Sequence, residues 1–273
     1  MRELALLALL YATYSLTRLV ADDALGPARE RAAALLDVEH VYGLAWERPL
    51  NDLFVDVDVL GLLGSYQYAT AHYVVTAVVL VWLYRRGPTA YVPGRRALLA
   101  ATVLALGLYL LLPMAPPRLV DGYVDVLALH AADGWWGGDA SAPQGLGGFT
   151  NQLAAFPSLH AGWALWVALV VQRHASRRIW RVLGWTHAAV TAAVIVGTGN
   201  HWVLDAVVGW LVVGVAWAGL DRRGSLHPTI VSSPTNRTSD HVESEGPPLS
   251  SEESSCALGP SPLPSSPSPC RSG

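Results

Sequence analysis

The sequence predicts an all-α integral membrane protein. Of its 273 residues, 52% are hydrophobic and only 14% are charged. The mean hydropathy of the chain is positive. This composition is typical of proteins that lie largely within a lipid bilayer.

Apolar stretches set the predicted number of membrane-spanning helices. A span needs roughly 20 mostly apolar residues. The stretches that qualify are 4–20, 66–84, 97–113, 157–172, 180–197 and 203–220. The first could instead be a cleaved signal peptide, but Glu3 weakens its basic start and "RLVADDA" offers no clear small-x-small cleavage site. We therefore predict a membrane domain of six helices over residues 1–221.

The basic residues, which are all Arg, predict the orientation of these helices. They cluster at 85–96, at 173–181 and at 222–223, whereas the stretch from 119 to 156 holds four Asp and no Lys or Arg. Arg-rich loops mark the cytoplasmic side of a membrane. The sequence thus predicts a multi-pass cell-membrane protein with both termini in the cytoplasm. Its net charge of −3 gives no reason to expect a nucleic-acid partner.

The segment between the first two predicted spans has a helical pattern of its own. In "ERAAALLDVEHVYGLAWERPLNDLF", apolar residues at spacings of three and four lie opposite acidic ones. The apolar set is Leu35, Val38, Tyr42, Ala45 and Trp46, and the acidic set is Glu30, Asp37, Glu39 and Glu47. This pattern predicts an amphipathic helix on the outer membrane interface.

Residues 222–273 form the second predicted region. They are rich in Ser and Pro, a composition that cannot bury a core, and we expect a disordered cytoplasmic tail without a catalytic role. Both cysteines, Cys256 and Cys270, fall in this tail. No disulfide framework is therefore expected in the membrane domain.

Three polar clusters stand at ends of the predicted spans. They are "LPMAPPRL" (112–119), "AAFPSLHAGWALW" (154–166) and "TGNHWVLD" (198–205). All three fall on the predicted outer face, although about 40 residues separate each from the next. A helical bundle could bring them together.

The residue types in these clusters suit phosphoryl transfer. His201 and Asp205 share one helical face, so the carboxylate can fix the tautomer of the ring and aim its other nitrogen outward. Pro157 suits a first helical position, and the amides of that turn, with the Ser158 hydroxyl, would form an anion site. Arg118 supplies a charged fork for phosphate oxygens. His160 can donate a proton to a leaving oxygen.

Other polar residues have two interpretations each. Asn151 and Asn200 could contact substrate or serve as turn and capping residues. His72 could contact substrate or form interhelical hydrogen bonds.

Two further classes of function remain open on the residues alone. One is a transporter or proton relay that uses His72, His160, His201 and Asp205. The other is a metal site on His160, His201 and Asp205, which Arg118 disfavours because a cation beside a divalent ion is repelled. We expect neither a metal nor another cofactor.

The three clusters together resemble the type 2 phosphatidic acid phosphatase (PAP2) superfamily of membrane phosphatases and phosphotransferases. "PSLH" is similar to its second motif, usually Pro-Ser-Gly-His, and "HWVLD" to the His-x-x-x-Asp end of its third. The resemblance covers roughly residues 1–220, and "APPRL", "FPSLHAGWALW" and "TGNHWVLD" are most similar to the branch with inositol phosphorylceramide synthases.

This resemblance implies a PAP2-like bundle, a role for each motif residue and a class of substrate. His201 would be the nucleophile that forms a phosphohistidine, with Asp205 as its orienting group and His160 as general acid and then base. Arg118 and Ser158 would bind the phosphate. The substrate would be a lipid or polyprenyl phosphate at the outer face, with water or an alcohol such as a polyol as acceptor.

Several positions depart from the motifs of the wider superfamily. Leu111 and Leu119 replace a Lys and a Pro of the first motif, Leu159 replaces the Gly of the second, and Val194 and Ile195 replace a Ser-Arg pair in the third. Two phosphate-binding cations are thereby missing. The sequence therefore predicts a phosphodiester donor and headgroup transfer in preference to phosphatidate hydrolysis.

Overall fold

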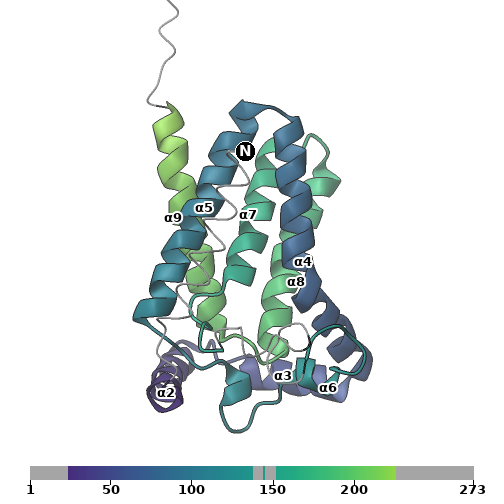
Figure 1. The fold of residues 1–273 in the computed structure, drawn as a ribbon, viewed down its shortest axis with the longest axis vertical. Coiled ribbons are helices and arrows are strands. Elements are labelled where there is room, and N and C mark those ends of the chain that lie inside the picture. Colours follow the sequence, from purple (N-terminus) through teal and green to yellow (C-terminus); the bar gives the residue numbers. More distant parts are fainter. Residues whose placement is uncertain (1–23, 138–143, 145–151, 226–273) are drawn as a thin grey trace, which may run out of the picture. The chain divides into compact units, whose positions relative to one another are not determined.

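The structure is a computed structural model that describes residues 24–137, 144 and 152–225. Every regular element within these residues is a helix, which confirms the all-α class. The bundle consists of α4 (Asp58–Arg85), α5 (Pro88–Leu111), α7 (Leu159–His174), α8 (Arg178–Gly197) and α9 (Val203–Ser225). At one end of it lie α2 (Leu25–Tyr42), α3 (Glu47–Asp56), the 3₁₀ turn η1 (Pro117–Leu119) and α6 (Val126–Leu129) (Figure 1).

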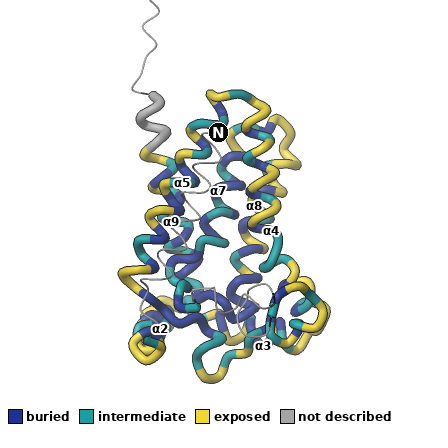
Figure 2. Tube along the Cα trace, in the orientation of Figure 1, coloured by how far each residue is buried: buried dark blue, intermediate teal, exposed yellow. Residues whose placement is uncertain are grey.

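Helix α7 is the centre of the bundle, because it packs against α4, α5, α8 and α9. Its Trp166 is fully buried and donates from its indole nitrogen to the Gly94 carbonyl of α5 at 2.8 Å. Buried residues follow the inner sides of the helices (Figure 2). The core thus extends along the bundle toward the end that carries α2 and α3.

Helices α7 and α9 approach each other closely near their first turns. A Cβ atom at Gly209 of α9 would lie 2.3 Å from the carbonyl oxygen of Ser158, at the start of α7. Only glycine leaves room for this approach. The two helix starts that carry the sequence motifs are consequently held side by side.

Helices of the structure match five of the six predicted spans in place. The predicted stretch 4–20 lies outside the described residues. Among the described helices, α5 and α8 are long and apolar enough to cross a membrane, and the apolar part of α9, Val203–Gly219, is shorter. Two such helices are compatible with a membrane protein, and the count of six spans stays a prediction.

The predicted boundaries need two corrections. Arg95 and Arg96 do not lie in a loop, because α5 already begins at Pro88, a residue whose fixed φ suits a helix start. Helix α9 continues through Ser225, so its last turn runs past the predicted boundary at residue 221. The rest of the predicted tail, from residue 226, lies outside the described residues.

The predicted amphipathic helix needs two corrections. It is two helices, α2 and α3, and the acidic side chains of Glu39 and Glu47 are buried at 0% and 1% exposure. Val38, Tyr42 and Trp46 of the predicted apolar face are exposed and Leu35 is buried, and the position at the outer membrane interface stays a prediction. The carboxylates turn inward because they find backbone donors there, as described below.

The topology can be tested by cysteine accessibility. After replacement of Cys256 and Cys270 by Ser, a Cys at the exposed position Asp121 should react with an impermeant thiol reagent in intact cells. Cysteines at the exposed positions Thr89 and Ser176, in the predicted cytoplasmic loops, should not react until the membrane is opened. The reverse labelling pattern would place the polar clusters on the cytoplasmic side.

Candidate active site

The structure brings two of the predicted histidines together at the starts of α7 and α9. The ring centroids of His160 and His201 are 5.6 Å apart. Nδ1 of His201 lies 3.3 Å from Oδ2 of Asp205, which is fully buried. The spacing of four residues therefore produces the predicted His–Asp contact.

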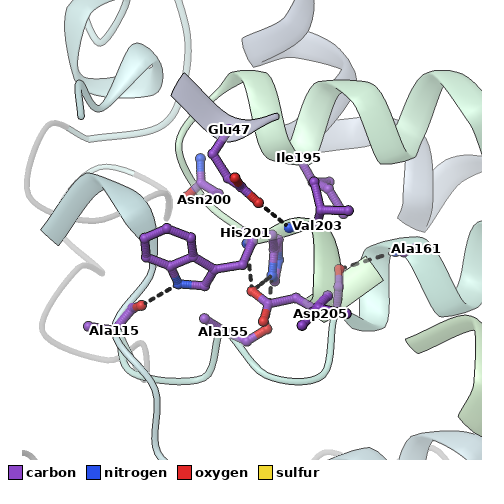
Figure 3. A network of polar contacts seen from close by, with 12 residues as sticks. Glu47, Ala115, Ala155, Ala161, Ile195, Asn200, His201, Val203 and Asp205 are labelled. Carbon is purple, nitrogen blue, oxygen red and sulfur yellow. Dashed lines mark hydrogen bonds and ion pairs between the residues drawn. The ribbon is translucent and has the colours of Figure 1, made fainter. Parts of the chain in front are cut away.

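A second acceptor fixes the tautomer of His201. Its Nδ1 lies 2.9 Å from the carbonyl oxygen of Ala155, in the segment before α7 (Figure 3). A carbonyl oxygen can only accept, so Nδ1 carries the proton and is shared between Ala155 and Asp205. This leaves the lone pair on Nε2 of His201, the nitrogen that a nucleophile would use.

Asp205 also organises the backbone at the start of α9. Its Oδ2 accepts from the amide of Trp202 at 2.8 Å. The fully buried indole of Trp202 donates in turn to the Ala115 carbonyl at 2.8 Å, next to the Arg118 segment. One carboxylate oxygen thus holds both the His201 ring and the turn that carries it.

Two further carboxylates complete this helix start. Oε1 of Glu47 accepts from the amide of Val203 at 2.7 Å, and Oε1 of Glu39 accepts from the amide of Leu204 at 2.6 Å (Figure 3 shows the Glu47 contact). Burial raises the pKa of Glu39 to about 9, and the hydrogen bond to Glu47 adds to this rise. The sequence interpretation placed both acids on a solvated face. The indication it overlooked was that Glu39 comes four residues after Leu35 and therefore shares its helical face.

Ser158 is the N-cap of α7. Its Oγ accepts from the amide of Ala161 at 3.3 Å, and its own amide donates to the backbone carbonyl of Asp205 at 2.9 Å. The sequence predicted Pro157 as the first helical residue, but Pro157 precedes the N-cap Ser158 and lies outside α7. Helix geometry leaves the amides of Leu159 and His160 without intrahelical partners.

His160 lies in a row of aromatic rings. It stacks on Tyr68 of α4, with ring centroids 4.4 Å apart, and lies 3.9 Å from the ring of His72. Nδ1 of His72 is 3.1 Å from the carbonyl oxygen of Tyr68, one turn earlier in α4. His72 therefore touches the candidate acid rather than standing apart from the site.

Arg118 is held against the turn that precedes His201. Its amide donates to the Gly199 carbonyl at 2.8 Å, and its Nε donates to Oδ1 of Asn200 at 3.0 Å. Asn200 donates in turn to Thr198. Asn200 accordingly positions Arg118, and its contact with substrate stays a prediction.

Asp125 is a partner of Arg118 that the sequence interpretation missed. Its Oδ2 lies 3.6 Å from Nη1 of Arg118, with side-chain exposures of 18% and 7%. Burial raises the pKa of Asp125, while the Arg118 charge opposes this rise. The sequence interpretation gave the Arg118 charge no partner other than phosphate, but Asp125 already neutralises part of it.

Several hydrogen bonds connect the loop that carries Arg118 to α2, α3 and the end of α8. Arg29 and Arg31 of α2 donate to the carbonyls of Leu119 and Pro113 at 2.7 and 2.6 Å. Asn51 of α3 binds both the amide and the carbonyl of Val124 and the carbonyl of Gly197. The remaining predicted contact residue, Asn151, lies outside the described residues.

The positions that depart from the motifs differ in their surroundings. Ile195 is fully buried in an apolar cluster with Ala161 and Ala206, so the larger Arg would not fit without repacking. Leu111, at the end of α5, is 75% exposed. Within the described residues, no group of three or more His, Cys, Asp or Glu side chains is arranged to hold a metal ion.

The fold and this cluster define a helical-bundle protein with two histidines, an aspartate and an arginine gathered at one end. A sequence model of the PAP2 superfamily matches residues 33–219 of the chain. The chain therefore belongs to the PAP2 superfamily, whose members are in general phosphatases and phosphotransferases that act on lipid phosphates. No curated protein and no solved structure matches it.

Gly199 offers a test of the turn that holds Arg118 and His201. Its φ is +75°, and a Cβ there would lie 2.7 Å from the carbonyl oxygen of Val124. We expect Gly199→Ala to lower the free energy of unfolding by about 1–3 kcal/mol because both strain and a clash arise. Thermal denaturation in detergent measures this. Gly107→Ala, with open space around its Cβ, is the matched control and should be neutral or stabilising. Equal melting temperatures for the two variants would contradict the assigned strain.

Proposed function

We propose that this protein transfers a phosphorylated headgroup from a phosphodiester lipid to an alcohol, through a phosphohistidine on His201. The observation that carries the proposal is the fixed tautomer of His201, whose Nδ1 is 2.9 Å from Ala155 and 3.3 Å from Asp205. A neutral imidazole held in this way presents its Nε2 lone pair as a nucleophile.

The first step forms the covalent intermediate. Nε2 of His201 attacks the phosphorus, the bond from phosphorus to the diacylglycerol oxygen breaks, and protonated His160 gives its proton to that leaving oxygen. The ring centroids of His160 and His201 are 5.6 Å apart, so both histidines can contact one substrate. Asp205 stabilises the positive charge that develops on the His201 ring.

The second step reverses the roles. Neutral His160 takes the proton of an acceptor hydroxyl, the acceptor oxygen attacks the phosphorus, and the bond to Nε2 of His201 breaks. A polyol or another alcohol gives transfer, and water gives hydrolysis. Transfer of a phosphorylated headgroup to an alcohol is the activity that the likeness to inositol phosphorylceramide synthases favours.

Phosphate binding falls to the start of α7 and to Arg118. The amides of Leu159 and His160 and the Ser158 hydroxyl are donors at a helix N-terminus, where an anion is favoured. Arg118 has five N–H donors, of which Asn200 and Asp125 occupy only some. Since Asp125 offsets part of its charge, one negative charge on the substrate is better balanced than two.

The two histidines should be essential for turnover. His201→Ala should abolish both turnover and covalent labelling by a radiolabelled donor. His160→Ala should lower kcat by about 10²–10⁴-fold, the usual contribution of a general acid. Asp205→Asn should cost less than His201→Ala because the nucleophile remains. His174→Ala, at the far end of α7, is the control and should keep wild-type kcat. Near wild-type turnover by His201→Ala would refute the mechanism.

Asp125 should set the preference for the charge of the donor. Asp125→Asn keeps the oxygen that caps α6 but removes the negative charge beside Arg118. We expect it to raise kcat/KM for a phosphomonoester lipid relative to a matched phosphodiester, by about tenfold if the change in Arg118 charge is worth about 1.4 kcal/mol. Asp121→Asn, on the exposed part of the same loop, should leave the ratio unchanged. A wild-type enzyme that already prefers the monoester and releases free phosphate would be a plain phosphatase.

A further inference from the structure

Glu39 and Glu47 lie outside every sequence motif, yet both are buried at the start of the helix that carries His201. Each uses Oε1 to accept from a backbone amide of α9. Each leaves Oε2 buried and without a hydrogen-bond partner among the described residues. The two carboxyl groups are close enough for Glu47 to raise the pKa of Glu39, as a hydrogen-bonding neighbour and as a like charge. Two carboxyl groups can hydrogen-bond to one another only if one of them carries a proton.

We propose that Glu39 and Glu47 share one proton and act as a positioning pair for His201. The shared proton satisfies both orphaned Oε2 atoms and removes the repulsion of two adjacent anions. Where catalysis is concerned, the inference rests on the proposed function. The pairing itself does not depend on any activity.

A short series of contacts links the pair to the His201 ring. Glu47 and Glu39 hold the amides of Val203 and Leu204, which are consecutive in the first turn of α9. Asp205, in the same turn, accepts from Trp202 and contacts Nδ1 of His201. A shift of this turn would move both the carboxylate and the ring, and misplacement of a reacting group by about 1 Å can cost about 10²-fold in rate.

Other ionisable groups lie near the pair. Asp205 of α9 acts on Glu39 as a like charge. The ring of Tyr123 lies 5.5 Å from that of Trp202, and the charges of both Glu residues contribute to raising the pKa of Tyr123. Arg48 of α3 lies 5.7 Å from the centre of the Tyr123 ring and 3.6 Å from Asp52. Of these groups only Arg48 is cationic, and it is already paired, so a proton is the available means of lowering the negative charge.

Stability should therefore depend on pH in a defined direction. Burial raises the pKa of Glu39 from 4.5 to about 9 on folding. Between these values the folded protein holds a proton that the unfolded chain has lost. Folding stability is then highest below the unfolded value and falls as the pH rises toward about 9.

Glutamine variants of the full chain test the shared proton without relying on activity. Glu39→Gln keeps the acceptor for Leu204 and donates to Glu47 from its NH₂ group, as the shared proton does. In detergent, the melting temperature of the wild-type protein should fall between about pH 6 and about pH 9.5, and that of Glu39→Gln should fall distinctly less. Glu30→Gln, on the exposed face of α2, should follow the wild type.

Glu47→Gln and the double variant of Glu39 and Glu47 test whether the two residues share one proton. Glu47→Gln should behave like Glu39→Gln, and it carries the test if Glu39→Gln does not fold. The double variant should melt lower than the two single changes would predict by addition, because two amide groups then face each other and the pair no longer gives a negative charge to the helix start. Additive effects, or a pH dependence of melting that is the same in both single variants as in the wild type, would overturn the proposal.

Infrared spectroscopy observes the proton directly. The carbonyl stretch of a protonated carboxyl should be present in the wild type at neutral pH and lost in both single Gln variants, but not in Glu30→Gln. Its persistence in both single variants would overturn the proposal as well.

Kinetics then separate positioning from simple stabilisation. For the wild type, kcat should fall near pH 9 as the pair loses its proton, as a step separate from the fall that deprotonation of the general acid His160 causes. In Glu39→Gln this step should move to higher pH with KM unchanged, whereas Glu39→Ala should lower kcat per folded molecule at every pH. A step that stays in place in Glu39→Gln would overturn the positioning role. If no lipid phosphate is turned over by the wild type, the proposed function fails, while melting and infrared still decide whether the proton is shared.

Discussion

The start of α9 imposes the requirement on which the rest of the site depends. The first amides of a helix have no intrahelical acceptors, and a helix that begins inside a protein must obtain them elsewhere. Here each of three backbone amides donates to a carboxylate oxygen. Trp202 donates to Asp205, Val203 to Glu47 and Leu204 to Glu39. Two of these acids come from α2 and α3. The same contacts therefore attach the end helices to the bundle and fix the position of His201.

Helix α7 begins beside α9 but meets the requirement differently. Ser158 caps it with a neutral hydroxyl, and the backbone of Ser158 is tied to the carbonyl of Asp205 at 2.9 Å. The first amides of α9 thus donate to carboxylates of the protein. Under the proposed function, the first amides of α7 stay available to bind the phosphate of the substrate. This difference gives the paired helices separate tasks, although both carry a histidine in or beside their first turn.

Hydropathy and motif spacing predicted the helices and the His160, His201 and Asp205 cluster well, because burial of apolar stretches and the four-residue helical period are local properties. The assignment of Glu39 and Glu47 to a solvated face was wrong for a physical reason. Glu39 comes four residues after Leu35 and shares its buried side of α2, but a helical pattern does not show that the backbone amides of another helix lie there. Glu39 and Glu47 turn inward because helix amides meet them there, and the exposed Val38 and Trp46 suit a surface that faces lipid. The pairing of Arg118 with Asp125 was equally hidden, since it depends on how an irregular loop folds back.

The balance of charge explains why such a site tolerates so many acids. Like charges about 4 Å apart near a protein surface repel by about 4 kcal/mol, so three ionised carboxylates around one helix start would oppose both folding and the approach of a phosphate. The partial positive charge of a helix N-terminus, roughly half a unit, offsets only part of this. A proton held between Glu39 and Glu47 lowers the remaining charge without giving up either amide contact. Asp205 can then stay the anion beside His201, where a negative charge stabilises the imidazolium that forms as His201 becomes covalently bound to phosphorus.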